Sequence, residues 1–77
     1  TTTIVYGLPA PTRVRVRVYD VSGRCVRTLV DGEKPAGFHM TAWDGRDDRG
    51  HAASSGVYLY RLEALGRTLE SKMILLK

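Results

Sequence analysis

Residues Trp43–Leu62 read WDGRDDRGHAASSGVYLYRL, and no other stretch of the chain is so particular in composition. The stretch holds the single tryptophan, three aspartates between positions 44 and 48, a run of small residues and a segment with two tyrosines. We predict that Trp43 closes one strand into the core and that the aspartates and glycines turn the chain. Gly56–Ala64 is then the next strand, so we interpret this stretch as the main corner of the fold.

The length and composition indicate one globular domain. The chain has 77 residues, of which 43% are hydrophobic, and its formal net charge is +4. This charge is too small and too dispersed to indicate nucleic acid, and no apolar run approaches the ~20 residues of a membrane-spanning helix. A single cysteine, Cys25, excludes an intrachain disulfide. We therefore predict one module over residues 1–77 that is monomeric when isolated, with no nucleic-acid partner and no membrane insertion.

Strand signals recur along the whole chain with turn residues between them, whereas no helical apolar stripe of useful length occurs. The expected strands with clear bounds are Thr2–Leu8, Arg13–Tyr19, Phe38–Trp43, Gly56–Ala64 and Thr68–Leu76. A further strand is expected after the turn that follows Arg13–Tyr19. The pattern predicts an all-β fold, a small antiparallel immunoglobulin-like β-sandwich of six or seven strands.

The segment Arg13–Tyr19 shows the cleanest alternation, because arginines and valines occupy alternate positions. In a strand the valines share one face and the arginines the other, so we expect the valine face in the core and the arginine face in solvent. Such arginines could bind phosphate or an acidic partner, although an ordinary solvated face that deters edge-to-edge aggregation is the favoured interpretation. The residues of this possible basic patch are Arg13, Arg15, Arg17 and Arg27.

The turn after this segment raises a question of register. A three-residue loop would place Val18 opposite Val26 but would leave Leu29 on the arginine face. We therefore predict a β-bulge near Arg27 or Thr28 that turns Leu29 inward while Val26 stays buried.

The last two expected strands specify their own pairing. A turn at Leu65 and its neighbouring glycine pairs Leu62 with Leu69 on one face and Arg61 with Glu70 on the other. Because leucine is a poor residue for a positive φ, a four-residue loop around a type I turn is preferred over a two-residue loop. Together with the valine face, these pairs define the expected core: Val14, Val16, Val18, Val26, Trp43, Tyr58, Tyr60, Leu62, Leu69 and Met73.

Residue types used in catalysis and metal binding are present, but not at the spacings that those functions need. Asp44, Asp47 and Asp48 lack the ligand spacing of a calcium loop, so hydrogen bonds to turn backbone are the favoured interpretation. His39 and His51 have no Cys or His at zinc-ligand spacing, and neither a nucleophile elbow nor a phosphate-binding loop occurs. We predict no catalytic residue, no metal site and no cofactor, so the module is not expected to be an enzyme.

Several motifs together resemble the FlgD-like immunoglobulin-type domain. Val18–Arg24 (VYDVSGR) and Val26–Val30 (VRTLV) are similar to the start of that domain, and Trp43–Gly50 (WDGRDDRG) resembles its central turn. Ser55–Leu62 (SGVYLYRL) is similar to its next strand and Lys72–Lys77 (KMILLK) to its ending. The resemblance covers essentially the whole chain, and the motifs are specific in combination rather than singly.

The resemblance implies two functional settings. In the first, similar domains at the C-terminus of large secreted or surface proteins act as sorting signals for the type IX (Por) secretion system. Because the chain starts abruptly at Thr1 and stops at Lys77, it is expected to be the C-terminal end of a larger secreted protein. The leading hypothesis is a non-catalytic sorting and anchoring domain with the secretion machinery or other proteins as partners, exported through the periplasm to the cell surface or medium. The residues that match the parts read by such machinery are Gly56, Val57, Tyr58, Lys72, Met73 and Lys77.

The second setting is the flagellar hook-capping scaffold, which gives the alternative function of a structural module that works through protein–protein contacts. A weaker alternative is a carbohydrate-binding accessory module. That function would need an exposed aromatic platform, whereas Trp43, Tyr58 and Tyr60 are expected in the core.

Overall fold

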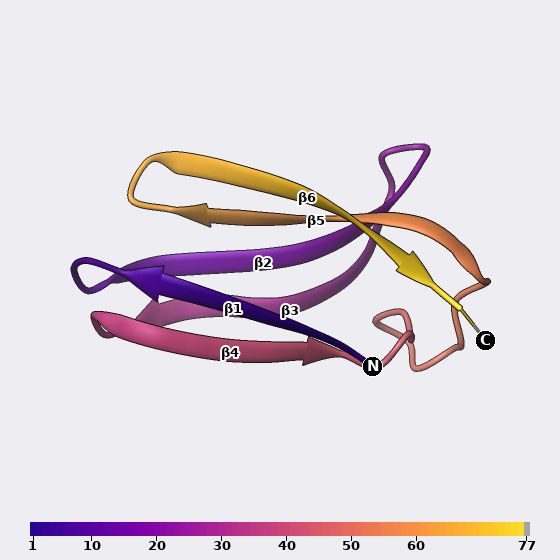
Figure 1. The fold of residues 1–77 in the computed structure, drawn as a ribbon, viewed down its shortest axis with the longest axis horizontal. Helices are drawn as coiled ribbons and strands as arrows, with labels where there is room; N and C mark the ends of the chain where they lie inside the picture. Colours follow the sequence, from indigo (N-terminus) through magenta and orange to yellow (C-terminus); the bar gives the residue numbers. More distant parts are fainter. Residues whose placement is uncertain (77) are drawn as a thin grey trace.

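Antiparallel strands arranged in two sheets make up the fold in the computed structural model, which describes residues 1–76. The strands within this range are β1 (Thr2–Leu8), β2 (Thr12–Asp20), β3 (Cys25–Lys34), β4 (Gly37–Trp43), β5 (Gly56–Ala64) and β6 (Arg67–Leu75). β1 pairs with β4 in a two-stranded sheet, and the larger sheet has the order β3-β2-β5-β6 (Figure 1). The predicted all-β antiparallel sandwich is confirmed, with six strands among the described residues. None of residues 1–76 belongs to a helix long and apolar enough to span a membrane.

The strand β2 is central because its sequence suits a position between two neighbours. It pairs with β3 on one side and with β5 on the other. Val14, Val16 and Val18 have no exposed surface, since their face is covered by the smaller sheet, while the arginines of β2 point to the opposite face. The alternation in the sequence therefore separates the core face from the solvent face of the larger sheet.

A first β-bulge changes the register just after the turn between β2 and β3. Tyr19 pairs with Cys25, as a three-residue loop predicts, but Val18 then pairs with Arg27, so that Val26 is the extra residue. The predicted pairing of Val18 with Val26 was wrong. Val26 is half-buried and packs against the core, because the bulge lets it lean inward without a partner in the ladder.

A second bulge follows after two more residues of β3. Arg17 pairs with Thr28 and Val16 with Val30, which leaves Leu29 as the extra residue. Leu29 packs against both parts of the core. The bulge predicted to turn Leu29 inward is therefore present, one residue beyond the predicted position.

The register of β5 and β6 agrees with the prediction from the sequence. Leu62 pairs with Leu69 and Arg61 with Glu70. The guanidinium Nη2 of Arg61 lies 2.9 Å from Oε2 of Glu70 on the outer face. Complementary side chains on both faces therefore set this register.

The turn between β5 and β6 differs from the prediction. Ala64 pairs with Arg67, so only Leu65 and Gly66 form the loop, with φ values of 53° and 71°. The preference for a four-residue loop was wrong. Two positive φ values give a turn whose twist matches that of the strands, and the paired strands impose it although a leucine in the left-handed region costs roughly 1–2 kcal/mol.

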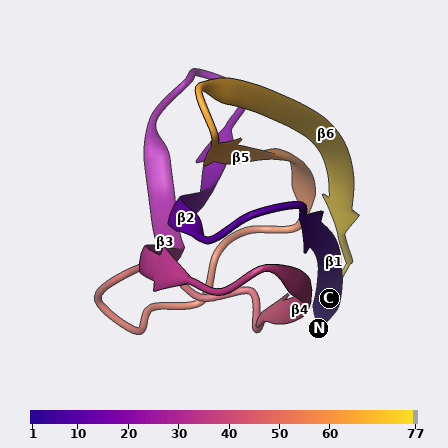
Figure 2. The ribbon, with the colours of Figure 1, turned by 90° about the vertical axis from the view of Figure 1, so that its left-hand side faces the viewer.

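The core lies between the sheets in two adjoining parts. One consists of Ile4, Tyr6, Leu8, Val14 and Val16. The other consists of Val18, Trp43, Tyr58 and Met73. Seen along the strands, the smaller sheet lies against one face of the larger sheet, whose outer members are β3 and β6 (Figure 2).

One residue expected in the core, Leu69, is not buried: 65% of it is exposed. Tyr60 and Leu62 are only half-buried. At a spacing of about 4.8 Å between strands, two strands cover about 10 Å, whereas four strands extend over about 19 Å. Because β1 and β4 pack over β2, β3 and β5, the start of β6 extends beyond the covering sheet and Leu69 faces inward without a layer opposite it.

Candidate functional site

The segment between β4 and β5, here called the aspartate loop (residues 44–55), is held in shape by its own carboxylates. Oδ1 of Asp44 accepts a hydrogen bond from the backbone N–H of Arg46 at 3.0 Å. Oδ1 of Asp47 accepts from the N–H groups of Arg49 and His51, each at 2.9 Å. These bonds are the turn-forming contacts expected for aspartate, and the hydrogen bond from the His51 N–H contributes most to lowering the pKa of Asp47 below its usual value.

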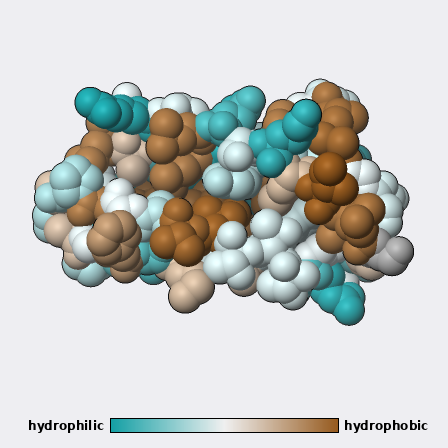
Figure 3. Space-filling model, in the orientation of Figure 1, coloured by the Kyte–Doolittle hydropathy of each residue, from teal (hydrophilic) through white to brown (hydrophobic). Residues whose placement is uncertain are grey.

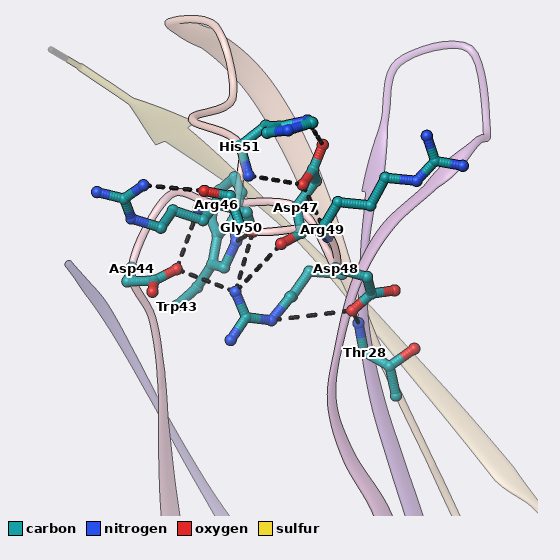
Figure 4. Close-up of polar contacts among 10 residues, drawn as sticks. Thr28, Trp43, Asp44, Arg46, Asp47, Asp48, Arg49, Gly50 and His51 are labelled. Atoms are coloured by element: carbon teal, nitrogen blue, oxygen red, sulfur yellow. Dashed lines mark hydrogen bonds and ion pairs between the residues drawn. The ribbon is translucent and has the colours of Figure 1, made fainter.

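The aspartate loop is docked on the outer edge of β3 (Figure 4). The backbone N–H of Asp48 donates to the carbonyl of Val26 at 3.1 Å. Oδ1 of Asp48 accepts from the N–H of Thr28 at 3.0 Å. The loop thus supplies partners to an edge that would otherwise expose backbone donors and acceptors.

Arg27 is the cation that holds this loop from the sheet side. Its Nη1 donates to Oδ1 of Asp44 at 3.2 Å and to the carbonyls of Arg46 and Asp47 at 3.3 and 3.4 Å. Its Nε lies 3.9 Å from Oδ1 of Asp48. The first bulge of β3 pairs Arg27 with inward-facing Val18, so Arg27 does not join the predicted basic patch. The sequence offered no signal for this role, because it depends on the bulge.

Trp43 and Tyr58 fix the two ends of the loop to the core. Trp43 is 1% exposed, and its Nε1 donates to the carbonyl of Arg46 at 2.9 Å. The ring of Tyr58 meets the indole edge-on with centroids 5.0 Å apart, and its hydroxyl donates to the carbonyl of Ser54 at 2.7 Å. Both aromatic groups therefore have their polar atoms satisfied inside the corner.

A polar hollow of about 710 Å³ lies between the aspartate loop and the turn from β2 to β3. Its lining includes Asp20, Cys25, Asp47 and His51. Oδ1 of Asp20 accepts from the hydroxyl and N–H of Ser22, and Asp47 is engaged within its own loop. The carboxylates of the hollow are thus used for turn geometry, and within residues 1–76 no cluster of three or more His, Cys, Asp or Glu is arranged to hold a metal ion.

The two histidines lie apart and have structural contacts. His39 stacks on Tyr6 with ring centroids 5.4 Å apart, and its Nε2–H donates to the carbonyl of Pro35 at 2.7 Å. His51 is largely exposed, with Nδ1 3.9 Å from Oδ2 of Asp47. Neither contact couples a histidine to a nucleophile.

The arginine face of β2 carries acids beside its bases. Arg13 and Arg15 lie 2.8 and 3.6 Å from Oδ1 of Asp31 on β3. On the other side Arg15 pairs with Glu63 of β5 in the ladder. A hydrogen bond with Tyr19 raises the pKa of Arg17. Arg17 is paired in the ladder with another arginine, Arg61 of β5, but Arg61 contacts Glu70 at 2.9 Å. Since Arg13, Arg15 and Arg61 each have a carboxylate partner, this face is a largely ion-paired surface rather than a concentrated positive patch.

Within residues 1–76, the residues that the sequence suggested for recognition do not share one exposed surface. Tyr58 and Met73 are buried, with 8% and 9% of their surface exposed, whereas Val57 is 41% exposed. Lys72 is exposed on the outer face of β6, opposite Leu59 of β5. The remaining two residues of the set are Gly56, at the start of β5, and Lys77, which lies outside the described residues.

The sequence comparisons point to flagellar proteins. The family model named FlgD Ig-like domain matches residues 1–67. Two curated relatives, each named basal-body rod modification protein FlgD, come from Salmonella typhimurium and Salmonella typhi. Each is 41% identical to this chain over 46 residues, or 60% of the chain. The match spans 20% of the length of these relatives.

A comparison of folds gives a similar result. The crystal structure of FlgD from P. aeruginosa matches with a TM-score of 0.66 and 29% sequence identity. The matched part covers 95% of this chain and 59% of the FlgD chain.

These findings correct two expectations from the sequence. The type IX sorting function was wrong, because the family model and the relatives are FlgD proteins and favour the hook-capping alternative. The expected secreted or cell-surface location rested on type IX export and is corrected with it. With residues 1–67 matched by the family model, the chain belongs to the FlgD Ig-like domain family.

Proposed function

We propose that this chain is a non-catalytic structural module of the flagellar hook-capping type that works through protein–protein contacts in flagellar assembly. The observation that carries the proposal is the match of residues 1–67 to the FlgD Ig-like domain. The named relatives are basal-body rod modification proteins. Residues 1–77 act as one module in this proposal.

The polar chemistry of the corner supports a structural role. The aspartate carboxylates accept backbone hydrogen bonds, and Arg27 is bound to the loop through three acceptors. These carboxylates and this guanidinium hold the loop in shape, and they are not arranged around a nucleophile as catalytic groups would be.

The outer face of the smaller sheet supports contacts with other proteins. Phe38 and Met40 of β4 are 88% and 71% exposed, and Val5 of β1 is 65% exposed. Met40 pairs with Val5, and Phe38 pairs with Gly7, so these apolar side chains are neighbours. Clustered exposed aromatic and methionine side chains are typical of protein interfaces.

The carbohydrate-binding alternative is not favoured. Its aromatic platform would consist of Trp43, Tyr58 and Tyr60, but the first two are buried and the third is half-buried. Their rings are therefore not available to stack on a sugar.

A chimeric flagellar protein tests the proposal. In Salmonella typhimurium FlgD, the segment that matches this chain would be replaced by the matching residues of this chain. The chimera would be expressed in a strain that lacks FlgD. We expect hooks to assemble and swimming to return, measured by electron microscopy and by spreading in soft agar. A matched chimera with Trp43→Ala, which unfolds the corner, should fail. A soluble, folded wild-type chimera that yields no hooks would contradict the scaffold function.

A further inference from the structure

The side of the sandwich between β1 and β6 is open. β1 has one strand neighbour, β4, so its other edge is unpaired. Beside that edge lie two adjoining hollows of about 280 and 440 Å³, and both are lined by Gly7, Leu62 and Leu69. Figure 3 shows apolar residues on this side of the molecule, below a margin of hydrophilic side chains. We call the two hollows and the β1 edge the side groove.

The edge of β1 lacks the protective features that the other edges have. β1 contains neither a charged residue nor a proline, whereas β6 carries Arg67, Glu70 and Lys72. The β3 edge is covered by the aspartate loop at Val26 and Thr28, and β4 packs against β3 at the corner between the sheets. An uncharged, unpaired strand edge is a template for pairing with another strand.

A single strand added beside β1 would extend the smaller sheet over the side groove. Leu69 of β6 is an inward-facing apolar residue that is left uncovered, while β1 lies on the near side of the groove. One additional strand at about 4.8 Å from β1 widens the smaller sheet to about 14 Å. That width brings a covering layer over Leu69 and the start of β6.

An antiparallel pair of β1 strands from two copies of this fold does not fit the side groove. In such a pair, the larger sheet of the second copy would still cover the β1 strand of that copy, because β1 and the larger sheet form one core. The start of β6 in the first copy already extends over that space. A strand without a second sheet attached to it avoids this overlap.

One charge lies at the end of the side groove next to Leu8 and Pro9. Arg67 pairs with Ala64, a residue of the inward face, and lines the larger hollow. No ion pair formed within residues 1–76 includes Arg67. A guanidinium in this position can bind a carboxylate at the end of a bound strand.

We propose that the side groove binds a single extended segment of a protein partner, which pairs antiparallel to β1, presents apolar side chains to Leu62 and Leu69, and places an acidic residue at Arg67. The inference rests on the proposed scaffold function, because it specifies the chemistry of the partner in that assembly. Backbone hydrogen bonds to β1 supply affinity, and the apolar pockets and Arg67 supply specificity.

Synthetic peptides test this directly on the 77-residue chain. The probe is acetyl-Asp-Val-Thr-Val-Thr-Val-Thr-amide, and the control replaces its central valine with proline, which removes a backbone donor and disfavours strand pairing. At millimolar probe, amide hydrogen exchange at alternate residues of β1 should slow about tenfold or more, because those N–H groups acquire partners. The proline peptide should change these rates less than twofold, by the same reasoning.

A matched pair of variants distinguishes probe binding in the side groove from nonspecific binding to exposed apolar residues. Leu69 and Ile74 are 65% and 62% exposed on opposite faces of β6. Leu69→Lys places a charge in the groove and should weaken probe binding about tenfold or more, whereas Ile74→Lys should change it less than twofold. Arg67→Gln should weaken binding of the Asp probe about threefold. It should not affect binding of a probe in which Asn replaces this Asp.

Each of several outcomes would overturn the inference. These are unchanged β1 exchange at millimolar probe, protection at β6 instead of β1, and equal loss of binding in the two lysine variants. A dimer by light scattering with β1 protected in the absence of peptide would assign the groove to a second copy. The flagellar chimera gives an independent result: hooks that assemble while the probe fails to bind would retain the scaffold function and reject the groove.

Discussion

Met73 and Leu69 lie on the same face of the same strand, yet Met73 is 9% exposed and Leu69 is 65% exposed. Met73 lies at the closed end of the sandwich, where Trp43, Tyr58 and the aspartate loop surround the end of β6. Leu69 lies at the open side, where no strand among the described residues covers it. The direction of a side chain is therefore not enough for burial, since burial also needs an opposing layer.

The closed end shows how such a layer is made without a strand. Carboxylates of the aspartate loop accept hydrogen bonds from the backbone of the same loop. The loop is attached to β3 by Arg27 and Asp48. Gly45 lets it approach the sheet: this residue has φ 78°, and a side chain added to it would contact Leu75 at 3.3 Å. A polar segment thus completes the core at one end, while the side between β1 and β6 stays open.

The largest contrast is expected between two aromatic residues of β4. Trp43→Ala should lower the free energy of unfolding by about 3–5 kcal/mol, because it removes a buried ring and leaves a cavity. Phe38→Ala should change it by less than about 1 kcal/mol, since the ring is 88% exposed. Urea unfolding followed by circular dichroism measures both values. Similar losses in the two variants would contradict the assignment of Trp43 as the centre of the closed end.

The comparison within β6 is tested by truncating both residues. Met73→Ala should cost about 2–4 kcal/mol and Leu69→Ala less than about 1 kcal/mol, because only the methionine leaves a cavity. The same unfolding experiment applies. If Leu69→Ala proved as costly as Met73→Ala, the side groove would already be filled within the isolated chain.

Arg27 tests the attachment of the aspartate loop. Arg27→Met keeps an apolar stem and removes three donor contacts, which should cost about 1–3 kcal/mol. Proteolysis should then cut within residues 44–55 before the rest of the chain unfolds. The control is Arg24→Met, because Arg24 is 81% exposed and only 3.6 Å from Asp20, and exposed pairs contribute about 0–1 kcal/mol. Equal protease sensitivity in the two variants would show that Arg27 does not hold the loop.

The turn at the open side offers a stabilising change. Leu65 has φ 53°, and asparagine tolerates this region better than leucine. Leu65→Asn should therefore raise the free energy of unfolding by about 0.5–1 kcal/mol. Leu65→Val, which is β-branched, should lower it. A loss of stability in the asparagine variant would mean that contacts of the leucine outweigh its backbone strain.

The smallest expected effect is a pH dependence from the aspartate loop. Backbone hydrogen bonds, that from His51 first, place the pKa of Asp47 lower in the folded than in the unfolded chain. Its stabilising contribution is complete above the unfolded value and is lost as the pH falls through the folded pKa, that is, below about pH 4. Asp47→Asn keeps an acceptor oxygen but does not titrate. The wild-type melting temperature should therefore fall more steeply than that of the variant below pH 4, and parallel curves would contradict this role.

Much of the fold followed from local patterns. The alternation around Val16 predicted the core face of β2, and the complementary pairs around Arg61 and Glu70 predicted the register of β5 and β6. The role of Arg27 could not be predicted in this way, because a bulge changes which face a residue occupies. The two-residue turn at Leu65 was also missed, since the pairing of the strands outweighs the preference of the residue.

The sequence by itself determined the strands, their faces and the family, because these depend on the alternation of side chains and on combined local motifs. The tertiary structure decided which inward-facing residues are covered. A two-stranded sheet does not span a four-stranded one, so the start of β6 extends beyond β1, whereas the aspartate loop packs against the other end of β6. That mismatch in width, which no single strand encodes, separates Met73 from Leu69 and creates the side groove.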